Sequence, residues 1–189
     1  DIKVIINAGT AYTSWSGAEN WIDEEVLTTI RKWIDNGGGF IGVGEPTAYQ
    51  YQGKFFQLSD VLGVDKEVGF TLSHDKYNTV DPNHFIVEDI EGEIDFGEGM
   101  ASIYGYGENY QIIRQHKLVT NTYGAGRSVY LAGLPYSPQN CRLLLRAIYW
   151  AAAKEDEMKK YYVDNVNAEV AAFEAVGKIV VINNSLDAL

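Results

Sequence analysis

The stretch Lys3-Val4-Ile5-Ile6-Asn7-Ala8-Gly9 opens with a continuous apolar run, which predicts a strand buried on both faces. Asp23 stands where it can cap a helix whose apolar residues recur at helical spacing, and Gly37-Gly38-Gly39 ends that helix. Phe40-Ile41-Gly42-Val43 predicts a second buried strand. Strand, helix and strand in this order form a βαβ unit, so the sequence predicts a parallel sheet.

The segments that follow predict a mixed or antiparallel continuation of this sheet. A loop is predicted at Pro46, and residues 55–62 predict a short amphipathic turn. Short strands separated by Asp, Asn and Gly turns are predicted at residues 70–73, 84–87, 102–104, 111–113, 117–120 and 127–132. Ser137 and Pro138 then predict the start of a helix. One face of that helix is predicted to carry Cys141, Leu144, Leu145, Ile148 and Ala151.

The pattern changes beyond Lys154. A charged run is followed by three strand-like segments without helices between them, at residues 161–163, 169–173 and 178–182. We therefore expect an α/β domain over residues 1–158 and the truncated start of a C-terminal β domain over residues 159–189.

Composition excludes several classes of protein. The chain has 15 Lys and Arg against 26 Asp and Glu, a net charge of −11, which disfavours nucleic acid and anionic membrane surfaces as partners. No apolar run reaches the ~18 residues of a membrane span. The single cysteine excludes an internal disulfide, so we expect a reducing, cytoplasmic setting. Thirteen tyrosines and four tryptophans are typical of carbohydrate-handling proteins, although core packing explains the same counts.

Two cofactor motifs fail on their context. Gly37, Gly39 and Gly42 match G-x-G-x-x-G, but they follow a predicted helix and enter a strand, the reverse of a dinucleotide-binding turn. The three histidines lack any paired metal-ligand spacing. The sequence predicts neither a cofactor nor a metal.

A single cysteine in an α/β chain raises the possibility of a glutamine amidotransferase, whose nucleophile follows a strand. Cys141 lies instead on a predicted helix face beside leucines, which indicates an inert, packed thiol. The position after the strand at residues 40–43 holds Gly44-Glu45-Pro46, and a carboxylate cannot replace the thiolate. An active amidotransferase is therefore excluded.

Four polar residues are candidates for contacting a ligand or another domain. Asn7 and Glu45 follow two predicted parallel strands, whose carboxyl ends are where open α/β sheets bind ligands, although capping of a neighbouring turn explains Glu45 as well. His74 and Asp75 begin a dense polar cluster that could serve a sugar or an acid–base step, although such clusters are usually solvated loops.

Several stretches in a fixed order resemble one family, the 1,3-β-galactosyl-N-acetylhexosamine phosphorylases, also called lacto-N-biose or galacto-N-biose phosphorylases. The stretches that carry the resemblance are Val4–Gly9, Trp15–Gly17, Gly38–Pro46, Gly53–Glu67, Gly126–Tyr130, Gly133–Ser137, Asn165–Asn167 and Glu169–Ala171. The resemblance implies an α/β domain with a class I glutamine amidotransferase-like sheet, Rossmann-like and doubly wound with flanking helices, followed by a short C-terminal β segment.

The resemblance also implies an activity for a longer parent protein. That protein would be an intracellular, metal-independent inverting phosphorylase that splits β-1,3-galactosides of N-acetylhexosamines with phosphate to galactose 1-phosphate. Its catalytic residues would lie in an N-terminal (β/α)8 barrel that precedes this chain, so no catalytic residue is assigned here. Partners would be that barrel and a second copy in a homodimer, and phosphate would be a co-substrate rather than a cofactor.

Two functions remain open. The first is a non-catalytic central domain that supports the barrel and a dimer. The second is a stand-alone module that binds a sugar or another small molecule at the strand ends near Asn7 and Glu45.

Overall fold

The computed structural model describes residues 2–14, 16–67, 83–88, 90–99, 102–114 and 116–158, and the backbone pairing of residues 168–169 with 182–183. The chain divides into two units, Asp1–Glu155 and Asp156–Leu189. The first unit is a mixed α/β domain. In the described part of the chain no helix is both long and apolar enough to cross a bilayer.

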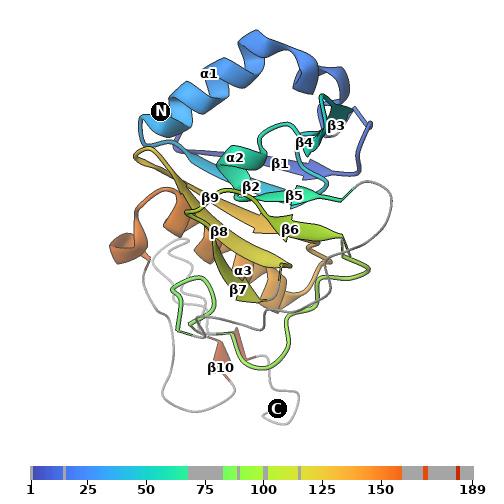
Figure 1. Cartoon of the computed structure of the whole chain (residues 1–189). Coiled ribbons are helices and arrows are strands. Elements are labelled where there is room, and N and C mark those ends of the chain that lie inside the picture. Colours follow the sequence, from blue (N-terminus) through green and yellow to red (C-terminus); the bar gives the residue numbers. More distant parts are fainter. Residues whose placement is uncertain are drawn as a thin grey trace. The chain divides into compact units, whose positions relative to one another are not determined.

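The first unit is organised around a five-stranded mixed sheet (Figure 1). Its strands, in spatial order, are β1 (Val4–Gly9), β2 (Gly39–Gly44), β9 (Gly126–Leu131), β8 (Leu118–Tyr123) and β7 (Gln111–Arg114). β1, β2 and β9 run parallel, whereas β8 and β7 continue the sheet antiparallel. The predicted parallel βαβ unit and the predicted mixed continuation are both confirmed.

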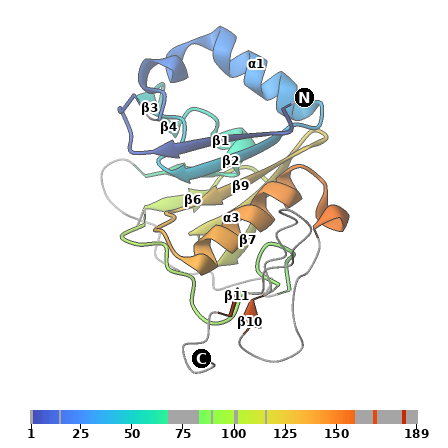
Figure 2. The ribbon, with the colours of Figure 1, turned by 180° about the vertical axis from the view of Figure 1, so that it is seen from behind.

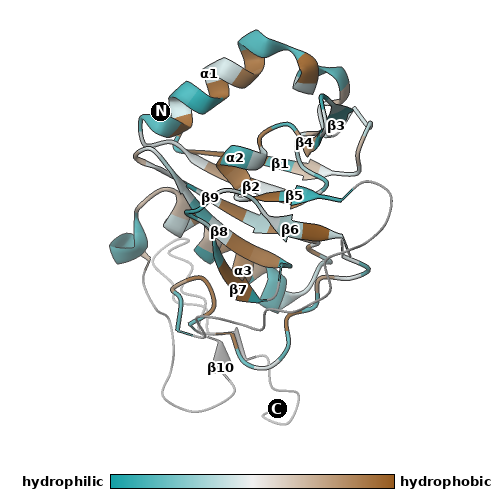
Figure 3. Ribbon diagram, viewed as in Figure 1, coloured by the Kyte–Doolittle hydropathy of each residue, from teal (hydrophilic) through white to brown (hydrophobic). Residues whose placement is uncertain are grey.

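Helices cover both faces of the sheet. α1 (Glu24–Asp35) begins at Asp23, whose carboxylate accepts the N–H groups of Glu25 and Val26 as predicted. α3 (Pro138–Ala151) lies against the opposite face, in front of the sheet in Figure 2. Alternate residues of β2 enter the two cores, with Phe40 on the α1 side and Ile41 on the α3 side. In Figure 3, brown hydrophobic residues run along β8 and β9 in the middle of the sheet, whereas the small strands β3 and β5 are largely teal.

The burial predicted for the first strand is wrong. Among the described residues, β1 pairs with β2 alone and lies at the edge of the sheet, so Ile6 is 46% exposed and Ile2, just before the strand, is 73% exposed. An apolar run predicts a strand, but strand order is set by contacts distant in sequence.

Between β2 and the second half of the sheet the chain forms small elements. The hairpin of β3 (Ala48–Tyr51) and β4 (Lys54–Phe56) was not predicted. α2 (Ser59–Leu62) confirms the second half of the amphipathic turn predicted at residues 55–62, whereas Phe55 and Phe56 lie in β4. β5 (Val64–Lys66) pairs antiparallel with β6 (Ile103–Gly105), which was predicted at residues 102–104.

The strand predicted at residues 84–87 is a turn. The N–H of Val87 donates to the carbonyl of His84, and the carbonyl of Phe85 accepts from the buried guanidinium of Arg146. The N–H of Val87 and the carbonyls of His84 and Phe85 are therefore not available for pairing with a neighbouring strand. The side chains of Ile86 and Val87 are buried in the core. The strand predicted at residues 70–73 lies outside the described residues.

The predicted face of α3 is partly wrong. The helix begins as predicted, with the Ser137 hydroxyl accepting the N–H of Asn140. Ala151 is buried, and Leu144 and Ile148 pack half-buried against the core, as predicted. Leu143 and Ala147 complete the buried stripe, whereas Cys141 is exposed and Leu145 is 46% exposed. Arg146 lies on the buried face of the helix, where its guanidinium donates to the carbonyl of Phe85. Cys141 is therefore not the packed thiol that the apolar spacing indicated.

In the second unit, β10 (Ala168–Glu169) and β11 (Ile182–Asn183) form one antiparallel pair. The short 3-10 helix η2 (Glu155–Glu157) spans the division between the units. The strand predicted at residues 161–163 and most of the other two lie outside the described residues. The β domain over residues 159–189 stays a prediction.

Candidate functional site

Asn7 connects two loops at the carboxyl end of the parallel strands. It lies in β1, and its side-chain N–H donates to the carbonyl of Ser16 at 3.0 Å. Its side-chain oxygen accepts the N–H of Thr47 at 2.7 Å. Asn7 therefore joins the loop that follows β1 to the loop that follows β2.

Glu45 makes the second connection between these loops. It follows β2 directly and is 7% exposed. Its Oε2 accepts the N–H of Ala11 at 2.7 Å, and its Oε1 contacts the Nζ of Lys66 at 2.6 Å. The structure therefore brings Asn7 and Glu45 to one edge of the sheet, as the strand pattern predicted, with the polar atoms of both side chains engaged within the fold.

The loop over residues 10–17 is ordered by further hydrogen bonds. The Thr13 hydroxyl donates to the carbonyl of Thr10 at 2.7 Å, and the Ser16 hydroxyl donates to the carbonyl of Thr13 at 3.0 Å. The indole N–H of Trp21 donates to the Ser16 carbonyl that Asn7 also contacts. A Cβ at Gly17 would lie 2.6 Å from the Trp21 indole nitrogen, so only glycine fits there.

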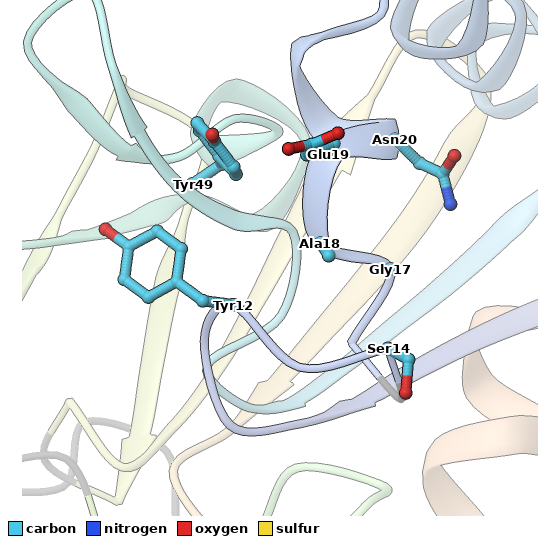
Figure 4. A pocket seen from close by; sticks show the side chains of 7 residues that line it. All are labelled: Tyr12, Ser14, Gly17, Ala18, Glu19, Asn20 and Tyr49. Carbon is cyan, nitrogen blue, oxygen red and sulfur yellow. The ribbon is translucent and has the colours of Figure 1, made fainter.

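A pocket of about 520 Å³ opens beside this loop (Figure 4). The rings of Tyr12 and Tyr49 lie on one side of the pocket, and Ser14 and Asn20 lie on the other. The complete lining is Tyr12, Ser14, Gly17, Ala18, Glu19, Asn20 and Tyr49. Volumes of roughly 300–1,000 Å³ are typical of small-molecule sites.

The aromatic wall of the pocket is fixed by its neighbours. The Tyr12 and Tyr49 rings meet edge to face with centroids 5.5 Å apart, and the Phe55 ring meets Tyr12 at 6.3 Å. The Tyr12 hydroxyl accepts the N–H of Gln50 at 3.3 Å. The ammonium of Lys66 lies 4.6 Å from the Phe55 centroid, which links this wall to the ion pair with Glu45.

Unusual backbone conformations gather around the pocket. Tyr12, Ala18 and Thr47 have φ values of 60°, 42° and 53°. Each such left-handed residue costs about 1–3 kcal/mol and persists only where its surroundings impose it. Tyr12 and Ala18 line the pocket, and Thr47 bonds to Asn7. Clusters of this kind are found at binding sites, which makes the pocket a candidate site.

Two groups near this edge have raised pKa values. Burial, and then the negative charge of Glu45, raise the pKa of the Tyr130 phenol, whose O–H donates to the carbonyl of Gly44 at 3.2 Å. Burial raises the pKa of Asp65, although its Oδ1 accepts the N–H groups of Phe55, Phe56 and Lys66. Tyr130 stabilises the end of β2 and Asp65 stabilises β4 of the β3–β4 hairpin, and neither residue lines the pocket.

The other two candidates, His74 and Asp75, lie outside the described residues. Among the residues that the structure does describe, no group of three or more His, Cys, Asp or Glu side chains could hold a metal ion. Sequence reasoning missed Tyr12, Glu19 and Tyr49. A usable signal was present for the tyrosines, since each follows a predicted parallel strand within a few residues, as Asn7 and Glu45 do.

The fold and the loops at the strand ends define an α/β domain of a kind seen in other proteins. A cytoplasmic protein of Salmonella typhimurium matches with a TM-score of 0.53 at 15% identity, over 79% of this chain and 71% of that one, which shows the fold alone. The family is shown by sequence. Residues 1–156 match the lacto-N-biose phosphorylase central domain and residues 161–188 the C-terminal domain, so the chain belongs to the lacto-N-biose phosphorylase family.

Curated relatives of the chain are phosphorylases. A 1,3-beta-galactosyl-N-acetylhexosamine phosphorylase of Lachnoclostridium phytofermentans is 48% identical over 97% of this chain. An enzyme of the same name from Bifidobacterium longum is 40% identical over 98% of the chain. The chain spans only 26% of the first relative and 30% of the second. It therefore corresponds to one part of each of these relatives.

Proposed function

We propose that this chain is the non-catalytic central part of an inverting sugar phosphorylase. The parent protein would cleave galactosyl-β-1,3-N-acetylhexosamines with phosphate and release galactose 1-phosphate. The chain would support an N-terminal (β/α)8 barrel that carries the catalytic groups, and would contribute to a homodimer. Phosphate would act as co-substrate, without a cofactor, and the protein would act in the cytoplasm.

The observation that carries this proposal is the match of residues 1–156 to the family's central domain in a chain that spans 26–30% of its relatives. The geometry of Glu45 supports it. A general acid needs an oxygen free to face the substrate, whereas the two oxygens of Glu45 contact Ala11 and Lys66. The strand ends thus favour a supporting role over a chemical one.

We also propose that the α/β unit is a variant of the class I glutamine amidotransferase-like fold. The parallel strands β1, β2 and β9, with α1 between the first two, support this relationship. Glu45 occupies the position after β2, and the thiol of Cys141 is exposed on α3. The fold would serve here as a scaffold without amidotransferase chemistry.

The decisive experiment compares this chain with its full-length parent. Each protein is incubated with lacto-N-biose and phosphate, and galactose 1-phosphate is measured. We expect release by the parent and only background from the 189-residue chain. Release by the chain alone would contradict the supporting role, and an inactive parent would contradict the phosphorylase assignment.

A second measurement addresses the partners. Sedimentation velocity of the full-length parent, and of a mixture of this chain with the separately expressed remainder, reports dimerisation and docking. We expect a dimeric parent and a complex in the mixture. A monomeric parent would contradict the dimer, and absence of a complex would contradict docking on the barrel.

One observation favours the second candidate, a sugar-binding or small-molecule-binding module at the strand ends. The 520 Å³ pocket lies beside the loops that Asn7 and Glu45 hold together. A gene that encodes no barrel before Asp1 would favour this stand-alone module.

A further inference from the structure

We infer that β1 is a strand-addition edge, and that the segment immediately before Asp1 in the parent protein adds a strand to it. The inference rests on the proposed function, because only a parent chain that continues before Asp1 can supply this segment. It goes further by naming the surface of this chain that the rest of the parent covers.

The backbone of β1 offers hydrogen-bonding groups on its outer side. The carbonyls of Lys3 and Gly9 accept N–H groups from the start of β2 and from the residue that follows it, so the odd-numbered residues of β1 face β2. The N–H and C=O groups of Val4, Ile6 and Ala8 therefore point away from β2. In the described part of the chain no strand lies on that side, and such a row of groups is a template for pairing.

The side of β1 that faces α3 is also uncovered. Ile6 pairs in register with Ile41, which is fully buried in the core on the α3 side. Ile6 itself is 46% exposed, and Ile2 is 73% exposed. α3 packs on β2 and β9, and it leaves β1 uncovered in Figure 2. Parallel strands are normally covered on both faces, so β1 lacks both a neighbouring strand and a cover for Ile6.

The opposite edge of the same sheet shows how a free edge is protected. β7 has a register shift against β8 between Ile112 and Arg114, and Arg114 places a charge on the strand. Bulges and charges of this kind discourage pairing with another chain. The segment Val4–Gly9 has neither, because it contains no charged residue and no proline and pairs with β2 in unbroken register. The sequence of β1 is that of a strand with neighbours on both sides.

The place of β1 in the chain identifies the occupant of its edge. β1 begins at Val4, so a parent chain that continues before Asp1 leaves from the end of β1 itself. The chain spans only 26% of one curated relative and 30% of another. A parent of that length has ample chain for an added strand and for a layer over Ile6.

A second copy of the chain fits this edge less well. Pairing through β1 would bring together two chains that each carry a net charge of −11, and like charges oppose association. It would also extend the sheet edge to edge without adding a layer over Ile6. The segment before Asp1 can supply both the strand and the layer.

Hydrogen exchange at single backbone amides, measured by mass spectrometry with fragmentation, tests the inference in the 189-residue chain and in the parent protein. In the isolated chain the amides of Val4, Ile6 and Ala8 should exchange rapidly, as exposed backbone groups do. Those of Ile5 and Asn7 face β2 and should be protected, so they are the internal control. In the parent the three outer amides should exchange slower by about a hundredfold or more.

A substitution at the edge adds a second readout. Ile6→Lys gives β1 a charge of the kind that Arg114 gives β7, so it should slow aggregation of the isolated chain in light scattering. The Tm of the isolated chain should change by less than roughly 2 °C, because Ile6 is already half exposed. In the parent the same variant should remove the added protection of Val4 and Ala8. Ile22→Lys, at an isoleucine that is 36% exposed outside β1, is the matched control and should leave aggregation and exchange unchanged.

Three results would overturn the inference. Outer amides that are protected in the isolated chain at every concentration would show that another part of this chain covers the edge. Protection that rises with the concentration of the isolated chain would identify a second copy as the occupant. Equally fast exchange in the parent would show that no strand is added.

Activity separates this inference from the proposed function. A parent that releases galactose 1-phosphate but leaves the outer amides unprotected contradicts only the inference. An inactive parent with protected outer amides contradicts only the proposed function.

Discussion

Replacing Glu45 by glutamine tests whether the strand-end carboxylate holds the fold together. Both neighbours of the carboxylate are hydrogen-bond donors, the N–H of Ala11 at 2.7 Å and the ammonium of Lys66 at 2.6 Å. A glutamine offers one acceptor oxygen and one N–H2 group, so its nitrogen must face one of these donors. The oxygen should turn to Ala11, because the Lys66 side chain is 24% exposed and can reach water instead.

Glu45→Gln should lower the free energy of unfolding by the contribution of one charge-assisted hydrogen bond. Such a bond contributes about 1.5–3 kcal/mol, which for a domain of this size corresponds to a Tm lower by about 3–12 °C. Glu45→Ala should cost more, since it also leaves the N–H of Ala11 without an acceptor in a buried position. Glu93→Gln, at an exposed position, is the control, and its free energy of unfolding should stay within about 0.5 kcal/mol of that of the unsubstituted 189-residue chain.

Urea unfolding at pH 7 measures these free energies, and a Lys66→Met background isolates the ion pair. In that background Glu45→Gln should cost less, because the lost partner is already absent. Equal stability of Glu45→Gln and the unsubstituted chain, or the same cost with and without Lys66, would refute the reasoning. In the full-length protein, a fall in kcat of about a thousandfold with unchanged KM would instead make Glu45 catalytic.

The remaining predictions concern three residues that support the fold, Asp65, Gly126 and Arg146. Asp65→Ala should cost about 3 kcal/mol or more by orphaning three backbone N–H groups, whereas Asp65→Asn keeps the accepting oxygen and should stay within about 1 kcal/mol. Burial raises the pKa of Asp65 above its usual 3.8, so protonation of Asp65 stabilises the folded state, and this stabilisation is lost as the pH rises through the raised pKa. Urea unfolding from pH 3.5 to 7 should therefore show the Asp65→Asn variant gaining stability relative to the unsubstituted chain. A stability difference that stays constant with pH would contradict this. Gly126→Ala should lower the free energy of unfolding by about 1–3 kcal/mol, because the added Cβ would lie 2.1 Å from the Ile34 carbonyl oxygen. Gly53→Ala has nothing within 4 Å of its Cβ and should lose only about 1 kcal/mol, from the strain of its left-handed backbone. Thermal unfolding that shows Gly53→Ala to be the less stable variant would refute the collision. Arg146→Ala should cost about 3–5 kcal/mol in the same assay, since it leaves the Phe85 carbonyl unpaired and a cavity, and a cost no larger than that of Leu145→Ala would show that the buried guanidinium is dispensable.

Elements with a local signal were predictable from the sequence. The β1–α1–β2 unit follows from two apolar runs and the Asp23 cap, and α3 follows from Ser137 and Pro138. The β3–β4 hairpin turns at Gln52 and Gly53, whose φ values of 50° and 78° are those that a two-residue hairpin turn requires. Glycine is favoured in such turns, so Gly53 was a sequence signal for the hairpin. A glycine between two short aromatic segments could have indicated it.

Features set by distant contacts were not predictable. The apolar run at residues 84–87 forms a turn because Arg146, far along the chain, contacts the carbonyl of Phe85. The exposure of β1 depends on its place in the strand order. The same holds for the pocket, since Tyr12 and Tyr49 meet only when β1 and β2 align in register. Asn7 and Glu45 were placed at the correct edge, but their hydrogen-bond partners depend on the tertiary structure.

The mixed direction of the sheet has a consequence for how the chain folds. β7, β8 and β9 form a meander of neighbouring hairpins, whereas the pairing of β2 with β9 joins Gly39 to Arg127 across most of the domain. Closing that long loop costs more entropy than closing a hairpin turn, and non-local pairings slow folding. We expect the meander to be structured in the folding transition state, with the β1–α1–β2 unit docking onto β9 afterwards. Substitutions in β8 should then mainly slow refolding, and substitutions in β1 should mainly speed unfolding.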